Sequence, residues 1–566
     1  LETYASDSRD ALAASIQSGQ QNTEGDVRVA LLASRPEEIT ALRLEAVSRL
    51  RAGRLETGGG IHFGEGSPAG ELAFVFTGAA AAYPGMGRDL FSAFPSLGKL
   101  MTKRFPTAQD VADTLSTGLE SAFSQLRATT LVSQAQHLLV TQKLGLNPTV
   151  AMGLSSGESN SLIAFGTWVD ADGLMGTIGE SGMYDRYLAG TFDTARKAWG
   201  EKAPIEWATW RLRTSKASVR DAVKPEPRCD ITIIYSADDV VIAGEAAACQ
   251  RVIKRLGAPA IRVPHDLTVH TPAMASYEKT WHQLHFRKTK APDGVRFYAN
   301  AINGSYKVSA DSAANMLTAQ AVTPIDFPAT LRAAYADGVR TFVEIGPRDT
   351  LTGAIQETLG PKTLALPTDR FGAPALDCIA ALAAHLYAAG HTINMDWLKR
   401  ELTEAAANTI PLRIADKKSV TFAAHIKPPR LPKLAGQTGQ TARRRLARPK
   451  FPSFDPGSLP AAKPIRARTL PLPPGTSWTP PVVKTVGTAV LERTRAATAP
   501  TPPQATPPKT ASAKRVSPAP AQPRKTITPL DRKAPTGPSF TRADIEQAAV
   551  GNISSVFGDA FAAQDK

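Results

Sequence analysis

The sequence has few cysteines and no long hydrophobic run. Only three of its 566 residues are cysteine, at Cys229, Cys249 and Cys378, and they are distant along the chain without a metal-ligand spacing. This usage is typical of a reduced, cytoplasmic protein without structural disulfides. We find no opening signal peptide and no apolar stretch of about 18 residues that could span a bilayer. These absences argue against a disulfide-stabilised secreted domain and against a membrane-spanning protein.

Acidic residues are scarce in one segment, which holds the whole excess of positive charge. The chain has a formal net charge of +15, and residues 436–537 alone hold 18 Lys+Arg and 3 Asp+Glu, a net charge of +15. They also hold 20 of the 44 prolines, which predicts a disordered, extended linker over 436–538. The basic run at 441–450, TARRRLARPK, has no aromatic residues between its charges. We therefore favour a solvated linker over nucleic-acid binding.

Elsewhere, short apolar strands alternate with helical patterns. We expect buried strands at 72–76 (LAFVF), 149–152 (TVAM) and within 340–347 (RTFVEIGP). This alternation predicts an α/β fold whose large, hydrolase-like subdomain has a parallel sheet. Residues 230–264 have the pattern of two strands, a helix and a third strand. They predict a small ferredoxin-like α+β subdomain, at about 205–268, inserted into the larger one.

A nucleophile elbow is predicted directly after the strand at 149–152. The following residues, Gly-Leu-Ser-Ser-Gly, have glycine two positions either side of Ser155, and a helical pattern comes next. A sharp strand-to-helix turn needs small residues at those two positions and lifts the serine hydroxyl to the helix N-terminus. There, free N–H groups and the helix dipole favour a developing oxyanion. The motif alone is weak evidence, because serine and glycine are common in loops.

A reactive serine also needs a base, and His270 is the candidate. It stands in VPHDLTVHTPAM (263–274), with His265 before it and His282 and His285 after it. Four histidines close together raise the question of zinc, but their spacings match no standard site and no cysteine or acidic ligand accompanies them. We therefore expect no metal.

Four motifs in order resemble one family. They are FVFTGAAAAYPGMGRDL (74–90), GLSSGE (153–158), VHTPAM (269–274) and VEIGPRDTL (343–351). Together they resemble the acyltransferase domain of multidomain polyketide and polyunsaturated-fatty-acid synthases, which is akin to the malonyl transacylase of fatty-acid synthesis. An ordered set of four motifs is far more specific than any one of them alone.

The flanking sequence resembles other parts of such synthases, so we expect the chain to be a piece of a longer polypeptide. Residues 1–70 resemble a ketosynthase-to-acyltransferase linker, and 540–561 resemble the lead-in to a dehydratase domain. The predicted boundaries are 1–70 for the linker, 71–375 for the acyltransferase, 376–435 for a following segment, 436–538 for the disordered linker, and 539–566 for a truncated dehydratase-like start.

The resemblance implies a mechanism. Ser155 attacks an acyl thioester while His270, oriented by a backbone carbonyl, takes its proton. Backbone N–H groups of Ala79 and Ser156 form the oxyanion hole. The substrates are acyl-CoA or a phosphopantetheinyl carrier, with no bound cofactor. The implied partners are an acyl carrier protein and the neighbouring ketosynthase and dehydratase domains, with no nucleic acid and no membrane.

Departures from the family bear on the cargo. Leu154 replaces the family's histidine before the nucleophile, Gln134 loosely matches a pocket glutamine, and Val269 fits neither common extender type. Malonyl-type members carry an arginine 25 residues after the serine, where this sequence has Glu180. A glutamate in the pocket would repel a malonyl carboxylate. We therefore predict a cargo without a second carboxylate, either acetyl or a longer fatty chain.

Three other functions remain open from the sequence. The same Ser–His pair could release acyl chains to water as a thioester hydrolase. The domain could be a degenerate, non-catalytic scaffold, although the retention of both Ser155 and His270 opposes this. A conventional malonyl loader is the third alternative.

Overall fold

The computed structural model describes residues 1–22, 24–104 and 119–408, all within one unit, Leu1–Ile426. The predicted linker over 436–538 and the predicted dehydratase-like start at 539–566 lie outside the described residues. So does the second part of the predicted segment 376–435. In the part of the chain that the structure describes, we find no helix with the length and hydropathy that a membrane span requires.

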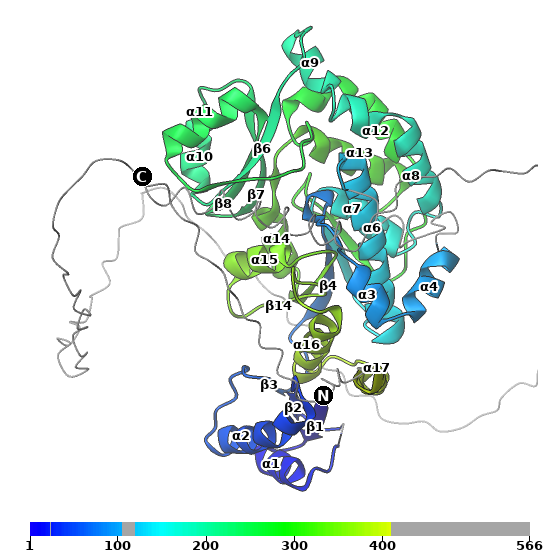
Figure 1. The fold of residues 1–566 in the computed structure, drawn as a ribbon, viewed down its shortest axis with the longest axis vertical. Helices are drawn as coiled ribbons and strands as arrows, with labels where there is room; N and C mark the ends of the chain where they lie inside the picture. Colours follow the sequence, from blue (N-terminus) through cyan, green and yellow to red (C-terminus); the bar gives the residue numbers. More distant parts are fainter. Residues whose placement is uncertain (23, 105–118, 409–566) are drawn as a thin grey trace, which may run out of the picture. The chain divides into compact units, whose positions relative to one another are not determined.

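A six-stranded sheet lies at the centre of the described residues (Figure 1). The strand order is β11-β10-β5-β4-β13-β14, and every neighbouring pair is parallel except β10 and β11. The strands are β4 (Glu71–Phe76), β5 (Val150–Gly153), β10 (Arg296–Ala299), β11 (Gly304–Tyr306), β13 (Val339–Ile345) and β14 (Leu364–Pro367). The predicted α/β class and the three buried strands are confirmed.

Both faces of this sheet are covered, which explains the continuous apolar runs of its strands. In β4, Phe74 and Phe76 pack into one core while Ala73 and Val75 pack into another. The first core contains residues of η2 (Ala79–Ala81), α3 (Arg88–Ala93), α4 (Ser96–Arg104), α6 (Ala122–Leu138), η3 (Leu139–Lys143), α7 (Ser156–Ala164), α8 (Ala171–Glu180), η4 (Met183–Tyr187), η5 (Pro272–Tyr277), α12 (Glu278–His285), α13 (Ala310–Val322), α16 (Ala375–Ala388) and α17 (Met395–Asn408). The second core is closed by α14 (Phe327–Ala336) and α15 (Thr350–Leu359).

A smaller sheet is inserted between α9 (Asp193–Trp199) and η5, as Figure 1 shows beside α10 and α11. Its order is β12-β7-β8-β6-β9. The elements are β6 (Trp207–Leu212), α10 (Lys216–Val223), β7 (Cys229–Ser236), β8 (Asp239–Glu245), α11 (Ala246–Leu256), β9 (Ala260–Arg262) and, later in the chain, β12 (Ile325–Asp326). The order β6-α10-β7-β8-α11-β9 is a ferredoxin-like arrangement. The strand–strand–helix–strand pattern predicted from the sequence corresponds to β7, β8, α11 and β9, the second half of this arrangement.

The N-terminal residues form a third, antiparallel sheet with its own core. Its strands pair in the order β1-β2-β3, and two helices complete the core. The elements are β1 (Glu2–Ser6), α1 (Arg9–Ser18), β2 (Val27–Leu31), η1 (Pro36–Glu38), α2 (Ile39–Arg51) and β3 (Ile61–Glu65). Helix α16 packs against β2 and β3, so this part is attached to the central sheet through the residues that follow β14.

Candidate active site

Ser155 lies at the turn between β5 and α7. Its backbone has φ +57° and ψ −124°, a strained conformation for a non-glycine residue. The glycines on either side are required by space, because a Cβ on Gly153 would lie 2.1 Å from the carbonyl carbon of Gly157. A Cβ on Gly157 would in turn lie 2.1 Å from the backbone oxygen of Phe76. This is the elbow geometry that the two glycines predicted.

His270 faces this elbow from the loop between β9 and η5. Its Nε2 lies 2.8 Å from Ser155 Oγ, and its Nδ1 lies 2.7 Å from the backbone oxygen of Gln320 at the end of α13. Because a carbonyl only accepts, Nδ1 carries the proton and Nε2 is left as the acceptor for the serine hydroxyl. The backbone of His270 is also held, with φ +64° and its N–H donating to the Ala321 carbonyl over 2.7 Å.

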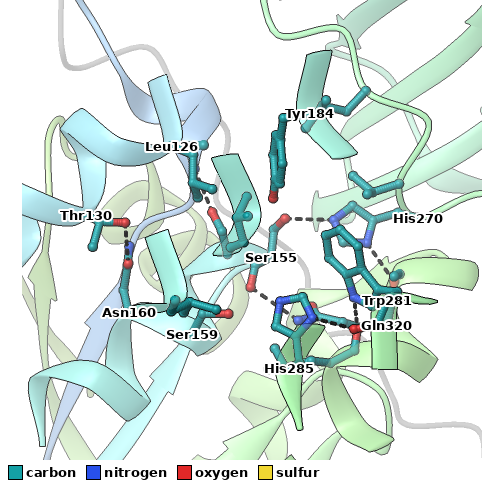
Figure 2. A pocket seen from close by; sticks show the side chains of 18 of the residues that line it. Leu126, Thr130, Ser155, Ser159, Asn160, Tyr184, His270, Trp281, His285 and Gln320 are labelled. Carbon is teal, nitrogen blue, oxygen red and sulfur yellow. Dashed lines mark hydrogen bonds between the residues drawn. The ribbon is translucent and has the colours of Figure 1, made fainter. Parts of the chain in front are cut away.

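The electrostatics of this pair suit a base. Burial lowers the pKa of His270 to about 4, with the Gln320 carbonyl acting in the opposite direction. The imidazole is therefore neutral at pH 7 and can accept the proton of Ser155. In Figure 2, dashed lines join Ser155 to both His270 and Gln320, and the side-chain Nε2 of Gln320 donates to the Ser155 backbone oxygen over 3.3 Å. No sequence pattern indicated Gln320, because it orients His270 through its main chain.

Two cavities meet at Ser155 and His270. The inner one has a volume of about 40 Å³. The outer one is a cleft of about 540 Å³ between the elbow and the small subdomain. The apolar part of the inner wall comes from Leu126, Leu174, Met175, Ile178, Val269, Trp281, Leu317 and Ala321.

Glu180 does not line either cavity, so its placement in the substrate pocket was wrong. It is the last residue of α8, and its side chain is exposed. The face of α8 toward the inner cavity carries Leu174, Met175 and Ile178 instead. The count of 25 residues from Ser155 identified the residue but not the helix face on which it lies, and Glu180 lies on the solvent-facing side of α8. Repulsion by Glu180 therefore gives no reason to exclude malonyl.

Gln134 is also outside the pocket, because it is fully buried in α6 behind Asn160. Its Nε2 donates to the backbone oxygen of Asn160 over 3.0 Å. Leu154 is 3% exposed and packs mainly in the core, although it borders the outer cleft. Val269 is the one pocket residue from the sequence that lines both cavities.

The inner wall contains no lysine or arginine among the described residues. Its histidines are His265, His270 and His285, and burial lowers the pKa of each to about 4. All three are therefore neutral at pH 7. Of the four histidines that the sequence brings close together, these three line one pocket.

The two positions predicted for the oxyanion hole lie together. The Ala79 N–H, at the start of η2, donates to the side-chain Oγ of Ser156 over 3.0 Å. Gly78 permits this approach, because a Cβ there would lie 2.8 Å from the Leu154 backbone oxygen. The side chain of Ser156, as well as its backbone, thus belongs to the site.

Residues 73–368, just over half of the chain, match the family described as "Acyl transferase domain". An elbow serine beside a histidine at the meeting of two cavities suits such a domain, and the chain belongs to this family. It is 23% identical over 362 residues to a polyunsaturated fatty acid synthase polypeptide of Thraustochytrium sp., covering 58% of this chain and 18% of that protein. It is 24% identical over 345 residues to 6-methylsalicylic acid synthase of Penicillium terrestre, covering 57% and 18%. The chain thus spans under a fifth of these curated relatives.

Solved structures share the fold. The acyltransferase domain from the second module of the salinomycin polyketide synthase gives a TM-score of 0.53 at 23% identity, covering 72% of this chain and 98% of that domain. The domain from module 8 of the same synthase gives 0.55 at 17% identity, covering 70% and 97%. The family and fold predicted from the four motifs are therefore confirmed.

Proposed function

We propose that the chain transfers a short, uncharged acyl group through a Ser155 acyl-enzyme. The donor is a thioester of CoA or a carrier protein, and the acceptor is the phosphopantetheine thiol of an acyl carrier protein. The observation that carries the proposal is the 2.8 Å contact between Ser155 Oγ and His270 Nε2, at the junction of a larger cleft and a small pocket with no lysine or arginine among its described lining residues. Both steps use His270, first as base toward Ser155 and then as acid toward the leaving thiol.

The pocket supports a cargo without a second carboxylate, for a reason different from Glu180. A malonyl carboxylate in the inner cavity would have no arginine or lysine among its described neighbours. An unpaired, buried carboxylate costs several kcal/mol. Malonyl is therefore disfavoured by the missing cation.

The volume of the inner cavity supports a short cargo. A dry engineered cavity of about 150 Å³ in another protein holds one benzene molecule. On that scale, the 40 Å³ of this cavity accommodates about two carbon atoms. Of the two cargoes left open by the sequence, acetyl matches the volume of the inner cavity better than a long fatty chain does.

The lining of the outer cleft supports the proposal that the donor and the acceptor carry a phosphate-bearing arm. Four arginines line it, at Arg211, Arg213, Arg262 and Arg348. Arg348 also packs over the rings of Tyr83 and Phe371 at 5.2 and 5.1 Å. Guanidinium groups suit the phosphates of CoA and of the phosphopantetheine arm.

Intact-protein mass spectrometry tests the proposal with acetyl-, propionyl-, malonyl-, hexanoyl- and palmitoyl-CoA. We expect an acetyl adduct that disappears in Ser155→Ala, with little malonyl or palmitoyl adduct. Addition of a holo carrier protein should move the acetyl group onto its thiol faster than water removes it. A dominant malonyl adduct contradicts the cargo, release to water alone indicates a hydrolase, and no adduct from any donor indicates a scaffold.

A further inference from the structure

The Ala79 N–H that the family resemblance assigns to the oxyanion hole already has a partner. It donates to Ser156 Oγ over 3.0 Å, and Ser156 lines the inner cavity next to Ser155. An N–H engaged in this way cannot also point fully at a thioester oxygen. The side chain of Ser156 therefore occupies the hydrogen-bonding direction of this N–H at the wall of the inner cavity.

The hydroxyl of Ser156 has a proton left to donate. A serine hydroxyl offers one donor and two acceptor positions. Its oxygen accepts from Ala79, and within the part of the chain that the structure describes we find no acceptor bonded to its proton. Ser156 is also half-buried and lines the inner cavity. A hydroxyl that accepts from an N–H becomes a better donor, because hydrogen bonds in a chain polarise one another.

We propose that the Ser156 hydroxyl is itself a catalytic donor of the oxyanion hole, polarised by the Ala79 N–H. This inference rests on the proposed acyl transfer and deepens it. Ser155 Oγ forms a bond to the thioester carbon while its proton passes to His270 Nε2. The carbonyl π electrons move to the oxygen, which accepts a hydrogen bond from Ser156. When the carbonyl re-forms, the C–S bond breaks and His270 returns the proton to the sulfur.

The alternative role for Ser156 is structural. Its hydroxyl could simply satisfy the first N–H of η2, which has no other side-chain cap. In that case the Ala79 N–H would need to be released before catalysis, and loss of the hydroxyl would leave the rate unchanged or raise it. The two roles thus predict different effects of the same substitution, because only the catalytic role predicts a lower rate.

The test compares Ser156→Ala with Ser156→Thr, which keeps the hydroxyl. Three quantities are measured: kcat/KM with acetyl-CoA, the affinity for a trifluoromethyl ketone analogue of acetyl-CoA, and the affinity for an unreactive thioether analogue. The ketone forms a hemiketal oxyanion with Ser155, whereas the thioether forms none. We expect Ser156→Ala to lower kcat/KM and ketone affinity together by about 100-fold, the usual effect of losing one oxyanion donor.

We further expect thioether affinity to stay within about twofold, and Ser156→Thr to recover most of the loss, since its hydroxyl remains. Ser156→Cys, a weaker donor, should lie between the two and serves as a second variant if Ser156→Ala does not fold. An equal or faster Ser156→Ala enzyme overturns the proposal, as does an equal loss of thioether affinity. If the unsubstituted chain forms neither acetyl adduct nor hemiketal, the acyl-transfer function itself fails.

Discussion

The size of the inner cavity can be changed at one residue, and the selectivity for acyl chain length should follow. Met175 lies on α8 and lines the cavity, and its side chain is only partly buried. Its truncation should therefore cost less stability than truncation of the fully packed Ile178 on the same helix. Met175→Ala removes three heavy atoms from a wall around a space of only about 40 Å³.

The expected change in selectivity follows from the free energy of transferring the acyl chain from water into the cavity. Each buried methylene contributes about 0.8 kcal/mol, and the truncation makes room for about three more carbons. The gain is then about 2.4 kcal/mol, or roughly 50-fold in the kcat/KM ratio of a longer acyl group over acetyl. This is an upper limit, because neighbouring side chains partly fill a new space.

Competition between hexanoyl- and acetyl-CoA, followed by mass spectrometry of the acyl-enzyme, measures this ratio directly. Glu180→Ala is the matched control, because Glu180 is exposed on the same helix and outside both cavities. We expect the Met175 substitution to favour hexanoyl and the control to leave the ratio unchanged. An unchanged ratio in Met175→Ala, or an equal shift in Glu180→Ala, would refute the assignment of the inner cavity to the acyl chain.

Three further predictions concern the elbow and its base. Since burial lowers the pKa of His270 to about 4, kcat/KM for acetyl-CoA should fall only as pH drops through about 4; an acid limb near pH 6.5 would contradict this. Burial raises the pKa of Glu158 to about 8, so its contribution to stability is lost as pH rises from 4.5 through 8. In urea unfolding, Glu158→Gln should therefore gain stability relative to the original chain between pH 5 and pH 9. A difference in unfolding free energy between the two chains that stays constant over this range would contradict this. Gly157→Ala puts a Cβ 2.1 Å from the Phe76 backbone oxygen, which should destabilise the chain by about 1–3 kcal/mol; an unchanged melting temperature would count against the elbow geometry.

The sequence predicted the features that depend on local structure. The glycines at 153 and 157 are required by space at the turn, so their spacing, together with the apolar strand before them and the helical pattern after them, indicated the elbow. His270 was predicted as the base because its motif follows the elbow in the order that the family resemblance implies, and the structure places its Nε2 2.8 Å from Ser155 Oγ. Strands such as 72–76 were predictable because burial on both faces makes them continuously apolar.

The pocket could not be predicted in the same way, because its walls depend on which side of each helix faces inward. Gln134 and Glu180 were placed by position along the chain, yet one packs behind Asn160 and the other faces solvent. Trp281 and His285 line the cavity from α12, and the sequence indicated neither as a wall residue. Residues more than a hundred positions apart form one wall, and no local period encodes such a contact.

The charge state of the site gives a physical reason for the proposed preference for an uncharged acyl group. His270 is oriented by the Gln320 carbonyl rather than by a carboxylate, so the dyad carries no charge before reaction. The neighbouring Glu158 is fully buried and accepts from the backbone and side-chain nitrogens of Asn300, and its raised pKa of about 8 keeps most of it protonated at pH 7. A neutral dyad in a pocket whose described lining residues include no lysine or arginine stabilises charge only where the oxyanion develops. A cargo that brought its own carboxylate would place a second, unpaired charge beside that oxyanion, so the same neutrality that suits the reaction favours an uncharged acyl group.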